Sequence, residues 1–339
     1  MRKTCPSMSL SKKPFRECAC TACTIEAPCK INLHLRIGER RSDGFHNLEG
    51  IFASLALGDT LRFECGGEEG ISQLSVNWGT DCGRETPGGE VPTDAHFIED
   101  NLVLKAISLF RERTGFKPGL AVHLEKRIPV GAGLGGGSSD AASTLLALNS
   151  LSERLCSAPL PMDGLKNLAE SLGSDVPFFL TGGTAFVSGR GELVEPLKPL
   201  DGHWVVLAKP PFPSETASAY RLLDRYREQK GEEGWRKAGN APSKEELILA
   251  LECKTEAWPF SNDFLQANTA AKTEVILDIL DSLRALGASF AGLSGAGSCC
   301  FGLFYGETEA KKAVGKLAGQ GNFTRLTFFL AYKAIPVLE

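Results

Sequence analysis

Five glycines lie close together in residues 129–140, between an alternating apolar segment and an alanine-rich one. They stand at positions 131, 133, 135, 136 and 137. A glycine backbone can take positive φ angles, and its N–H groups can approach another molecule closely. The helix that we expect to begin at Ser138 or Ser139 adds free N–H groups and the positive end of its dipole. The segment is therefore typical of an anion site, most often one for phosphate.

The glycine segment has three other interpretations. A purely structural turn would not need so many glycines, because each adds to the entropy cost of folding. A P-loop would carry a Lys after its last glycine, and no Lys stands near Ser138. The glycines at 131, 133 and 136 fit the dinucleotide fingerprint formally, but that site also needs an acidic residue after its second strand. Glu153, at about the right distance, lies in a loop of Ser and Leu residues, so another kind of phosphate loop is favoured.

Polar residues elsewhere could form the walls of a site around this loop. Residues 24–35 alternate as a strand does, and Lys30 and Asn32 then point to the same side, with Pro28 at an edge or a bulge. The loop at 38–47 combines Arg, Asp, Phe and His, which suits a flat polar ligand such as a nucleobase. An ordinary solvated face and an exposed connection are the respective alternatives.

Two charged residues next to glycines are further candidates. Asp175 opens a short helix, whose dipole keeps the carboxylate ionised, as a general base requires. Lys126 ends the strand at 120–128, just before the glycine segment, where a cation suits a phosphate or a substrate. A first-turn carboxylate and a basic strand end are the plain alternatives.

The elements that would position these residues follow from periodicity and turn residues. In the first part we expect helices over 101–113, 139–151 and 164–172, and strands over 24–35, 74–78, 120–128 and within 182–191, with two strands and a turn at 58–59 in the segment 48–63. Residues 65–97 are predicted to form a long surface segment, called the excursion below, that contains the short strand at 74–78. After a boundary near residue 200 we expect strands over 204–208, 289–293, 299–304 and 324–332, helices over 214–223, 262–286 and 307–318, and a charged loop at 227–244.

Length and composition limit the class of protein. A chain of 339 residues suits two domains better than one. Its net charge of −4 provides no basic field for nucleic acid, and no apolar run reaches the roughly 18 residues that span a membrane. The 11 cysteines are odd in number and irregularly spaced, which indicates a reducing compartment rather than a disulfide framework.

Five segments, taken together, resemble the GHMP small-molecule kinases. They are residues 28–33, 40–46, 129–139, 173–178 and 294–298, and the match runs in order from about 25 to 332. The first, second and fourth are most similar to the members of that family that phosphorylate a hydroxyl of CDP-methylerythritol with ATP, in the non-mevalonate isoprenoid route. The resemblance implies a two-domain α+β fold, like ribosomal protein S5 domain 2 at the N-terminus and ferredoxin-like at the C-terminus. The expected divisions are an extension at 1–22, predicted to be disordered, an ATP-binding domain at 23–198 and a second domain at 199–339.

The resemblance also implies a role for each site residue. Asp175 is the base that takes the proton of the acceptor hydroxyl, and Lys30 keeps that carboxylate ionised and orients the hydroxyl. The ATP phosphates, with Mg²⁺ between them, are held by Pro129, Gly131, Gly133, Leu134, Gly135, Gly136, Gly137, Ser138 and Ser139. Asp140 is a candidate metal ligand. The acceptor is bound by Asn32, Phe45, His46, Lys126, Thr216, Tyr220, Gly295 and Gly297, with His46 at the cytosine edge and Phe45 and Tyr220 stacked on the base.

Two residues depart from the pattern of this family. Phe45 stands where a Tyr is usual, so stacking is kept and a hydroxyl contact is lost. Cys29 replaces an alanine beside Lys30, which predicts sensitivity to thiol reagents.

Two other functions stay open: another GHMP kinase, of the homoserine or mevalonate type, and a nucleotide-binding paralogue without catalysis. We expect a monomer or weak homodimer that binds neither nucleic acid nor membrane, located in the cytoplasm, or in the plastid stroma if residues 1–22 belong to a transit segment.

Overall fold

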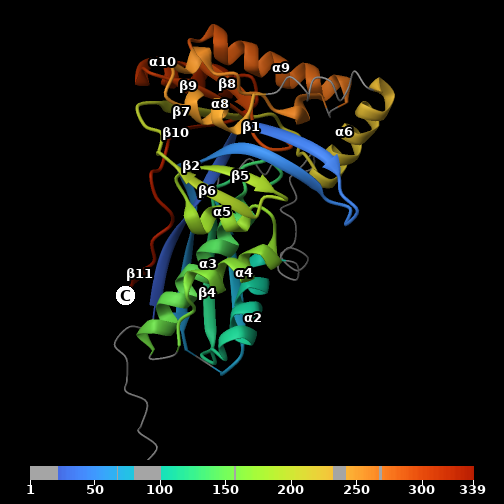
Figure 1. Cartoon of the computed structure of the whole chain (residues 1–339). Helices are drawn as coiled ribbons and strands as arrows, with labels where there is room; N and C mark the ends of the chain where they lie inside the picture. Colours follow the sequence, from blue (N-terminus) through green and yellow to red (C-terminus); the bar gives the residue numbers. More distant parts are fainter. Residues whose placement is uncertain (1–21, 67, 80–100, 156–157, 232–241, 267–268) are drawn as a thin grey trace, which may run out of the picture.

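The computed structural model describes residues 22–66, 68–79, 101–155, 158–231, 242–266 and 269–339, which form two β-sheets with helices packed against them (Figure 1). The larger sheet has the strand order β11-β1-β2-β4-β3, with β5 paired to β2 and β6 to β5. The smaller sheet has the order β10-β7-β9-β8. This arrangement confirms the predicted α+β class. The predicted extension at 1–22 lies almost wholly outside the described residues, as does most of the excursion at 65–97.

The larger sheet is built on a long antiparallel hairpin. Its strands are β1 (Ala22–Arg40), β2 (His46–Cys65), β3 (Ser72–Trp78), β4 (Leu120–Lys126), β5 (Thr184–Gly189), β6 (Leu193–Leu197) and β11 (Val337–Leu338). β2 pairs with β4 through residues 60–65 and with β5 through residues 48–53. β2 therefore pairs with β4 and β5 along one edge and with β1 along the other.

The predicted turn at 58–59 is wrong, because β2 continues through it. A register shift occurs there instead, between Pro28 and Cys29 of β1, which confirms the expected bulge at Pro28. A Cβ atom at Gly58 would lie 2.9 Å from the carbonyl oxygen of Ala27, so the glycine permits the close approach of two strands. The neighbouring Asp59 is fully buried, which a turn residue would not be.

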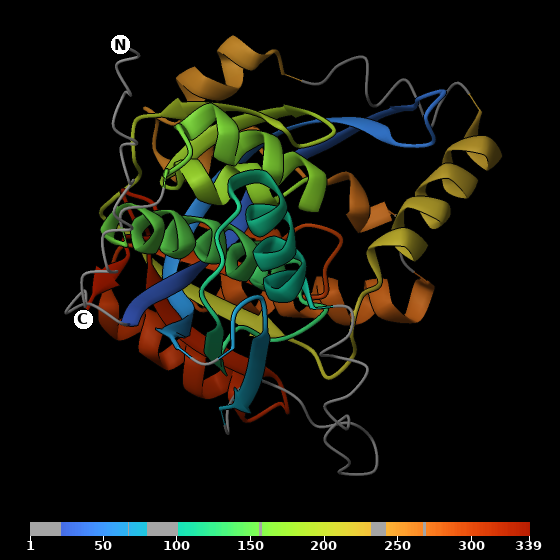
Figure 2. The same cartoon turned by 90° about the horizontal axis from the view of Figure 1, so that it is seen from below.

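Four helices cover one face of the larger sheet (Figures 1 and 2). They are α2 (Leu102–Thr114), α3 (Gly136–Arg154), α4 (Met162–Leu172) and α5 (Val176–Thr181). The side chain of Asn101 accepts a hydrogen bond from the backbone N–H of Val103, and Gly115 ends α2 with φ 70°, so this helix has the limits that its capping residues predict. The apolar stripe of α3 packs on β1 and β2.

The smaller sheet consists of β7 (Trp204–Lys209), β8 (Phe290–Leu293), β9 (Cys300–Phe304) and β10 (Phe323–Phe328). The helices of this part are α6 (Thr216–Lys230), α8 (Lys244–Ala250), α9 (Ala270–Ala285) and α10 (Glu307–Ala318). The expected loop at 227–244 begins later than predicted, because α6 continues to Lys230, and residues 232–241 lie outside the described part. The domain limits at 198 and 199 stay a prediction, and β11 returns to the larger sheet.

The predicted helix over 262–286 is wrong at its start. Residues 263–266 form a short 3₁₀ turn, and α9 begins at Ala270. The side chain of Asn262 donates hydrogen bonds to the carbonyl oxygens of Leu293 and Gly295 at 2.8 and 2.9 Å, and it accepts one from the N–H of Phe264. These bonds fix the segment against the turn at 294–298, which a continuous helix could not do.

Candidate active site

The glycine segment is a loop followed directly by a helix. Gly131, Gly133 and Gly135 have φ angles of 63°, 74° and 72°, which side chains other than glycine rarely adopt. α3 begins at Gly136, earlier than the predicted start at Ser138 or Ser139. Its first N–H groups therefore belong to two glycines without side chains to cover them, and Gly136, Gly137 and Ser138 line a cavity.

The glycine loop lies directly against the turn that connects β8 to β9 in the smaller sheet. The hydroxyl of Ser294 donates to the carbonyl oxygen of Gly133 at 2.9 Å, and the N–H of Cys299 donates to that of Ala132 at 3.1 Å. A Cβ atom at Gly133 would collide with the carbonyl oxygen of Ser294. The second glycine turn, 294–298, therefore closes on the first only because glycine stands at 133.

Lys30 and Asp175 form an ion pair beside the glycine loop. The Lys30 Nζ and Asp175 Oδ2 atoms are 3.4 Å apart, and the side chains are 4% and 31% exposed. The Lys30 ammonium also donates to Asn32 Oδ1 at 2.6 Å and lies 4.7 Å from the centre of the Phe52 ring. Asp175 precedes α5 and makes no capping hydrogen bond with its side chain, so its carboxylate is available to a ligand.

Backbone contacts tie this pair to the loop. The N–H of Lys30 donates to the carbonyl oxygen of Leu134 at 3.0 Å. A Cβ atom at Gly135 would lie 3.2 Å from Cγ of Lys30 and 2.9 Å from the Phe179 ring. The ion pair and the glycine loop are thus in van der Waals contact. Ligands bound to each of them would lie close enough for a group to be transferred from one to the other.

A cavity of about 510 Å³ joins these groups. Most of the predicted site residues line it: Lys30, Asn32, Lys126, Pro129, Gly131, Gly133, Leu134, Gly135, Gly136, Gly137, Ser138, Asp140, Asp175, Thr216, Tyr220 and Gly295. The structure does not bring Ser139, Phe45, His46 and Gly297 to its wall. Ser139 is fully buried, and a Cβ atom at Gly297 would lie 3.3 Å from the Leu293 side chain.

Lys126 is buried between two carboxylates. Its ammonium donates to Asp59 and, at 2.8 Å, to Asp140 Oδ2. Burial alone would lower the pKa of Lys126, but the charges of Asp140 and Asp59 raise it above its ordinary value. Burial raises the pKa of Asp140, and Asp59 raises it further against the effect of Lys126. Sequence reasoning missed Asp59, because the pair Gly58-Asp59 was interpreted as a turn.

The hairpin end of the larger sheet contacts α6. The His46 ring stacks on Tyr220, with centroids 5.0 Å apart and planes at 25°, and its Nε2 atom lies 2.9 Å from Asp224 Oδ1. Burial raises the pKa of Tyr220 to about 12, and the charge of Asp175 adds to the effect. Tyr220 therefore connects the hairpin to the Lys30–Asp175 pair. Sequence reasoning missed Asp224, which the pattern did not distinguish from a solvated helix residue.

Phe45 lies apart from Tyr220 in this structure. Its ring is 50% exposed and packs under the Arg190 guanidinium, 5.1 Å away, at a separate depression of about 480 Å³. The two rings that were expected to stack on one base thus face different neighbours here. Cys29 is fully buried, and burial raises the pKa of its thiol well above the ordinary value, which contradicts the expected sensitivity to thiol reagents.

The described part of the chain holds no group of three or more His, Cys, Asp and Glu side chains arranged for a metal ion. None of its helices is both long enough and apolar enough to cross a membrane.

Comparisons with known proteins agree with this geometry. Residues 101–183 match the model of the GHMP kinases N terminal domain, and residues 246–322 match that of the GHMP kinases C terminal domain. A 4-diphosphocytidyl-2-C-methyl-D-erythritol kinase from Synechococcus sp. is 37% identical over 87% of this chain and 92% of its own length. A chloroplastic kinase of the same name from Oryza sativa is 40% identical over 60% of this chain and 47% of its own.

Solved structures give the same result. A crystal structure of 4-(cytidine 5'-diphospho)-2C-methyl-D-erythritol kinase superposes with a TM-score of 0.69 and 32% identity, covering 90% of this chain and 98% of its own. A homoserine kinase from Cytophaga hutchinsonii shares the fold at 16% identity, with a TM-score of 0.63 over 96% of this chain and all of its own. This chain belongs to the 4-diphosphocytidyl-2-C-methyl-D-erythritol kinase family of the GHMP kinases.

Proposed function

We propose that this kinase transfers the γ-phosphoryl group of ATP to a hydroxyl of 4-diphosphocytidyl-2-C-methyl-D-erythritol, as a step of isoprenoid biosynthesis. The observation that carries the proposal is the ion pair of Lys30 and Asp175, 3.4 Å apart, on the wall of the cavity that the glycine loop also lines. Asp175 accepts the proton of the attacking hydroxyl. The bond from the γ-phosphorus to the bridging oxygen breaks, a bond to the acceptor oxygen forms, and ADP leaves.

The donor half of the site is the glycine loop. Uncovered N–H groups at the start of α3 face the cavity and suit the phosphate oxygens of ATP, which carry the charge that develops during transfer. We assign this role to residues 129–139. Lys30, whose ammonium touches both Asn32 and Asp175, neutralises charge next to the acceptor hydroxyl.

The residues near the loop can accommodate a magnesium ion. The Oδ1 atom of Asp140 and the hydroxyl of Ser139 are buried and have no hydrogen-bond partner among the described residues. Carboxylate and hydroxyl oxygens are ligands that Mg²⁺ accepts, alongside phosphate oxygens. When bound, the ion would supply positive charge that offsets the charge of the phosphates during transfer. Lys126 already donates to two carboxylates, so we assign it to holding Asp140 in place rather than to the substrate.

The acceptor half lies between the hairpin and α6. The Nδ2 atom of Asn32 is buried without a partner in the described part of the chain, so it can donate to an acceptor oxygen. Thr216 begins α6, and Gly295 and Gly297 belong to the turn at 294–298. We assign the cytosine to the surroundings of His46, Tyr220 and Phe45, where Phe45 turns from Arg190 toward the base.

Oligomeric state and location stay predictions: a monomer or weak homodimer, in the cytoplasm or in the plastid stroma. The chloroplastic relative from rice supports the second location, and the segment that would decide between them lies outside the described residues.

Replacement of the base tests the mechanism. Asp175→Asn keeps the size of the side chain but cannot accept the proton, so turnover should fall by about 10²-fold or more, as for loss of a general base. ATP affinity, measured by calorimetry, should stay near the wild-type value. Asp201→Asn, at an exposed site, is the matched control. Unchanged turnover in Asp175→Asn would exclude this role.

An acceptor panel tests the substrate. The wild-type enzyme should use the cytidine compound and ignore mevalonate and homoserine. The reverse preference would support the alternative GHMP kinases, and ATP binding without turnover of any acceptor would support a non-catalytic paralogue.

A further inference from the structure

Three side chains of α6 face the hairpin together. Tyr220, Asp224 and Arg227 are four and three positions apart, so they share one side of the helix. Arg227 is buried and donates to the carbonyl oxygen of Ile37 at 2.7 Å and to Asp263 at 2.9 Å. These contacts fix α6 against the hairpin, which holds the other two side chains at His46.

The contact between Asp224 and His46 determines which imidazole nitrogen carries a proton. The Nε2 atom lies 2.9 Å from the carboxylate, and a carboxylate only accepts hydrogen bonds. Nε2 must therefore be protonated, and in the neutral imidazole Nδ1 then presents a lone pair. Nδ1 has no hydrogen-bond partner among the described residues, so this acceptor is free for a ligand.

The stacking of His46 on Tyr220 sets the plane in which that lone pair lies. Because the imidazole is stacked within 25° of parallel on Tyr220, a base that rests on the same face of Tyr220, beside the imidazole, lies nearly in the imidazole plane. An in-plane hydrogen bond from the base edge to Nδ1 is then possible. Cytosine has an amino group at C4 that donates, whereas uracil has an oxygen there that accepts.

We propose that Asp224 is a positioning residue that fixes the Nε2–H tautomer of His46, and that the enzyme thereby selects cytosine over uracil in its acceptor. This inference rests on the proposed function, since it requires the pyrimidine to bind at His46. With uracil, two lone pairs would face each other, and the site would lose a hydrogen bond and leave both acceptors unpaired.

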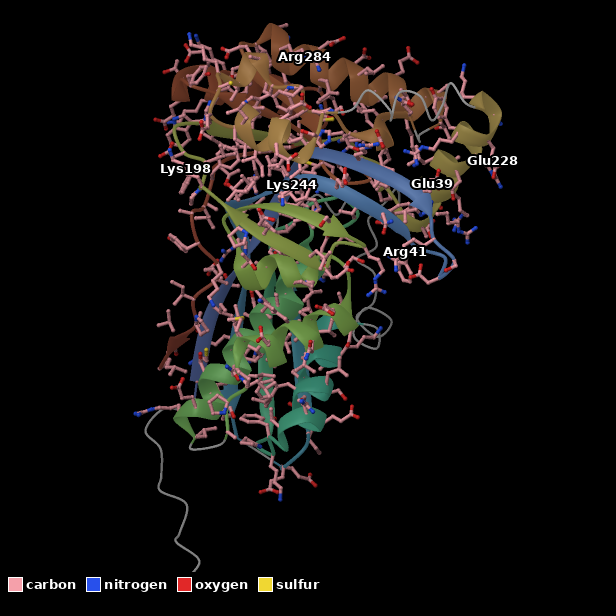
Figure 3. All side chains as sticks on the ribbon, viewed as in Figure 1. Glu39, Arg41, Lys198, Glu228, Lys244 and Arg284 are labelled. Carbon is pink, nitrogen blue, oxygen red and sulfur yellow. The ribbon has the colours of Figure 1, made fainter. Side chains whose placement is uncertain are left out.

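Substrate selectivity tests the proposal. The wild type should favour the cytidine acceptor over its uridine analogue. Asp224→Asn, whose amide can either accept or donate, should reduce the ratio of the two kcat/KM values by about 10-fold or more, as expected when a hydrogen-bond selection is removed. The loss should appear mainly in KM for the cytidine compound. Glu228→Gln, which removes a charge from the exposed side of the same helix (Figure 3), is the matched control and should leave the ratio unchanged.

A direct measurement of the tautomer complements the kinetics. In ¹⁵N spectra, the His46 signals, identified by their loss in His46→Gln, should show a protonated Nε2 and an unprotonated Nδ1 in the wild type, and a mixture in Asp224→Asn. A protonated Nδ1 in the wild type, or an unchanged ratio in a folded Asp224→Asn variant, would overturn the inference. Failure of the proposed function is distinguishable, because the wild type would then not turn over the cytidine compound at all.

Discussion

A single buried ammonium, that of Lys126, holds two carboxylates at the base of the active site. Asp59 also accepts hydrogen bonds from the backbone N–H groups of Arg127 and Ile128, at 2.5 and 2.8 Å. The Asp59 carboxylate thus fixes residues 127 and 128, which lead into the glycine loop, and the Asp140 carboxylate lies beside the proposed phosphate site. Removing the ammonium would leave two negative charges buried close together, which costs far more than the loss of one hydrogen bond.

We expect Lys126→Met to lower the free energy of unfolding by about 3–5 kcal/mol at neutral pH, the range for breaking a buried ion pair. The loss should be smaller at pH 5. Burial raises the pKa of Asp140 above its ordinary 3.8, and loss of the Lys126 charge, which lowers this pKa, raises it further in the variant. Above pH 3.8 the native variant therefore binds more protons than its unfolded state, and its stability falls more than that of the wild type as pH rises. Denaturant unfolding at pH 5 and 8 measures both effects.

The control for this variant is Lys198→Met, at the exposed position labelled in Figure 3. It should change stability by no more than about 0.5 kcal/mol, as surface substitutions do. An equal loss at both pH values in Lys126→Met would contradict the assignment to unpaired carboxylates.

The sequence predicted residue types better than residue partners. The position of Lys30 on the same side of a strand as Asn32 follows from period two, and the structure shows the two side chains hydrogen-bonded. Asp59, a partner of Lys126, and Asp224, the partner of His46, come from 67 and 178 residues away, a distance over which neither alternation nor turn residues carry information. Only the fold brings Asp59 and Asp224 to these sites.

Among the elements, two glycine turns from different sheets form one surface. The loop at 131–137 and the turn at 294–298 touch at Gly133 and Ser294, and Ser214 links them through its N–H to Gly131 and its hydroxyl to Ala296. Glycine therefore has two different uses within a few residues. At 133 it permits contact between elements, whereas at 137 the nearest atom to a Cβ would be Leu102 Cδ1, at 3.8 Å.

Alanine at these two positions should separate the two uses. Gly133→Ala should destabilise the protein by at least about 1–3 kcal/mol, from backbone strain alone. Gly137→Ala, in the first turn of α3, should instead stabilise it by about 0.4–1 kcal/mol, by restricting the unfolded chain. The added methyl group should nevertheless raise KM for ATP, since Gly137 lines the cavity. Thermal unfolding measures the stability change, and steady-state kinetics measure KM for ATP. A destabilised Gly137→Ala variant would contradict the role assigned to this glycine.

Element boundaries were predictable where local residues decide them. α2 and α10 begin and end within a residue or so of the expected limits, because capping or turn residues flank them. The predictions failed at 58–59 and at 262–269, where distant contacts decide. Gly58 meets β1, and Asn262 bonds to the turn at 294–298, so in both places a partner from another part of the chain overrides the local pattern.

At the scale of the molecule, the C-terminal residues lie beside the first described strand, β1. β11 pairs with the first residues of β1, and the Glu339 carboxylate accepts hydrogen bonds from Thr24 at 2.7 Å and Arg62 at 2.8 Å. The segment before β11 crosses from the smaller sheet to the larger one, where the N–H of Leu330 donates to Ser54 at 2.9 Å. The last residues thus join the two sheets, and residues 337–339 do not line the cavity.

Removal of residues 337–339 should therefore lower stability without changing the chemistry. The two exposed carboxylate contacts are worth about 1–3 kcal/mol together, at about 0.5–1.5 kcal/mol for each net hydrogen bond, and the lost strand pairing adds to this. KM for ATP and kcat should stay at wild-type values, because none of these residues lines the cavity. A fall in kcat at temperatures where the truncated protein is fully folded would show that the crossing segment also acts on the active site.

The fixed attachment of α6 to the hairpin has a consequence for engineering. The groups assigned to ATP belong to the glycine loop and α3. The groups assigned to the cytosine of the acceptor belong to the hairpin tip and α6, which are joined through Arg227, Asp224 and Tyr220. Hairpin and helix therefore behave as one exchangeable cassette. A graft of both segments from a relative with another acceptor keeps the two sides of these contacts matched, whereas a graft of either one alone replaces only one side of the contacts of His46 with Asp224 and Tyr220.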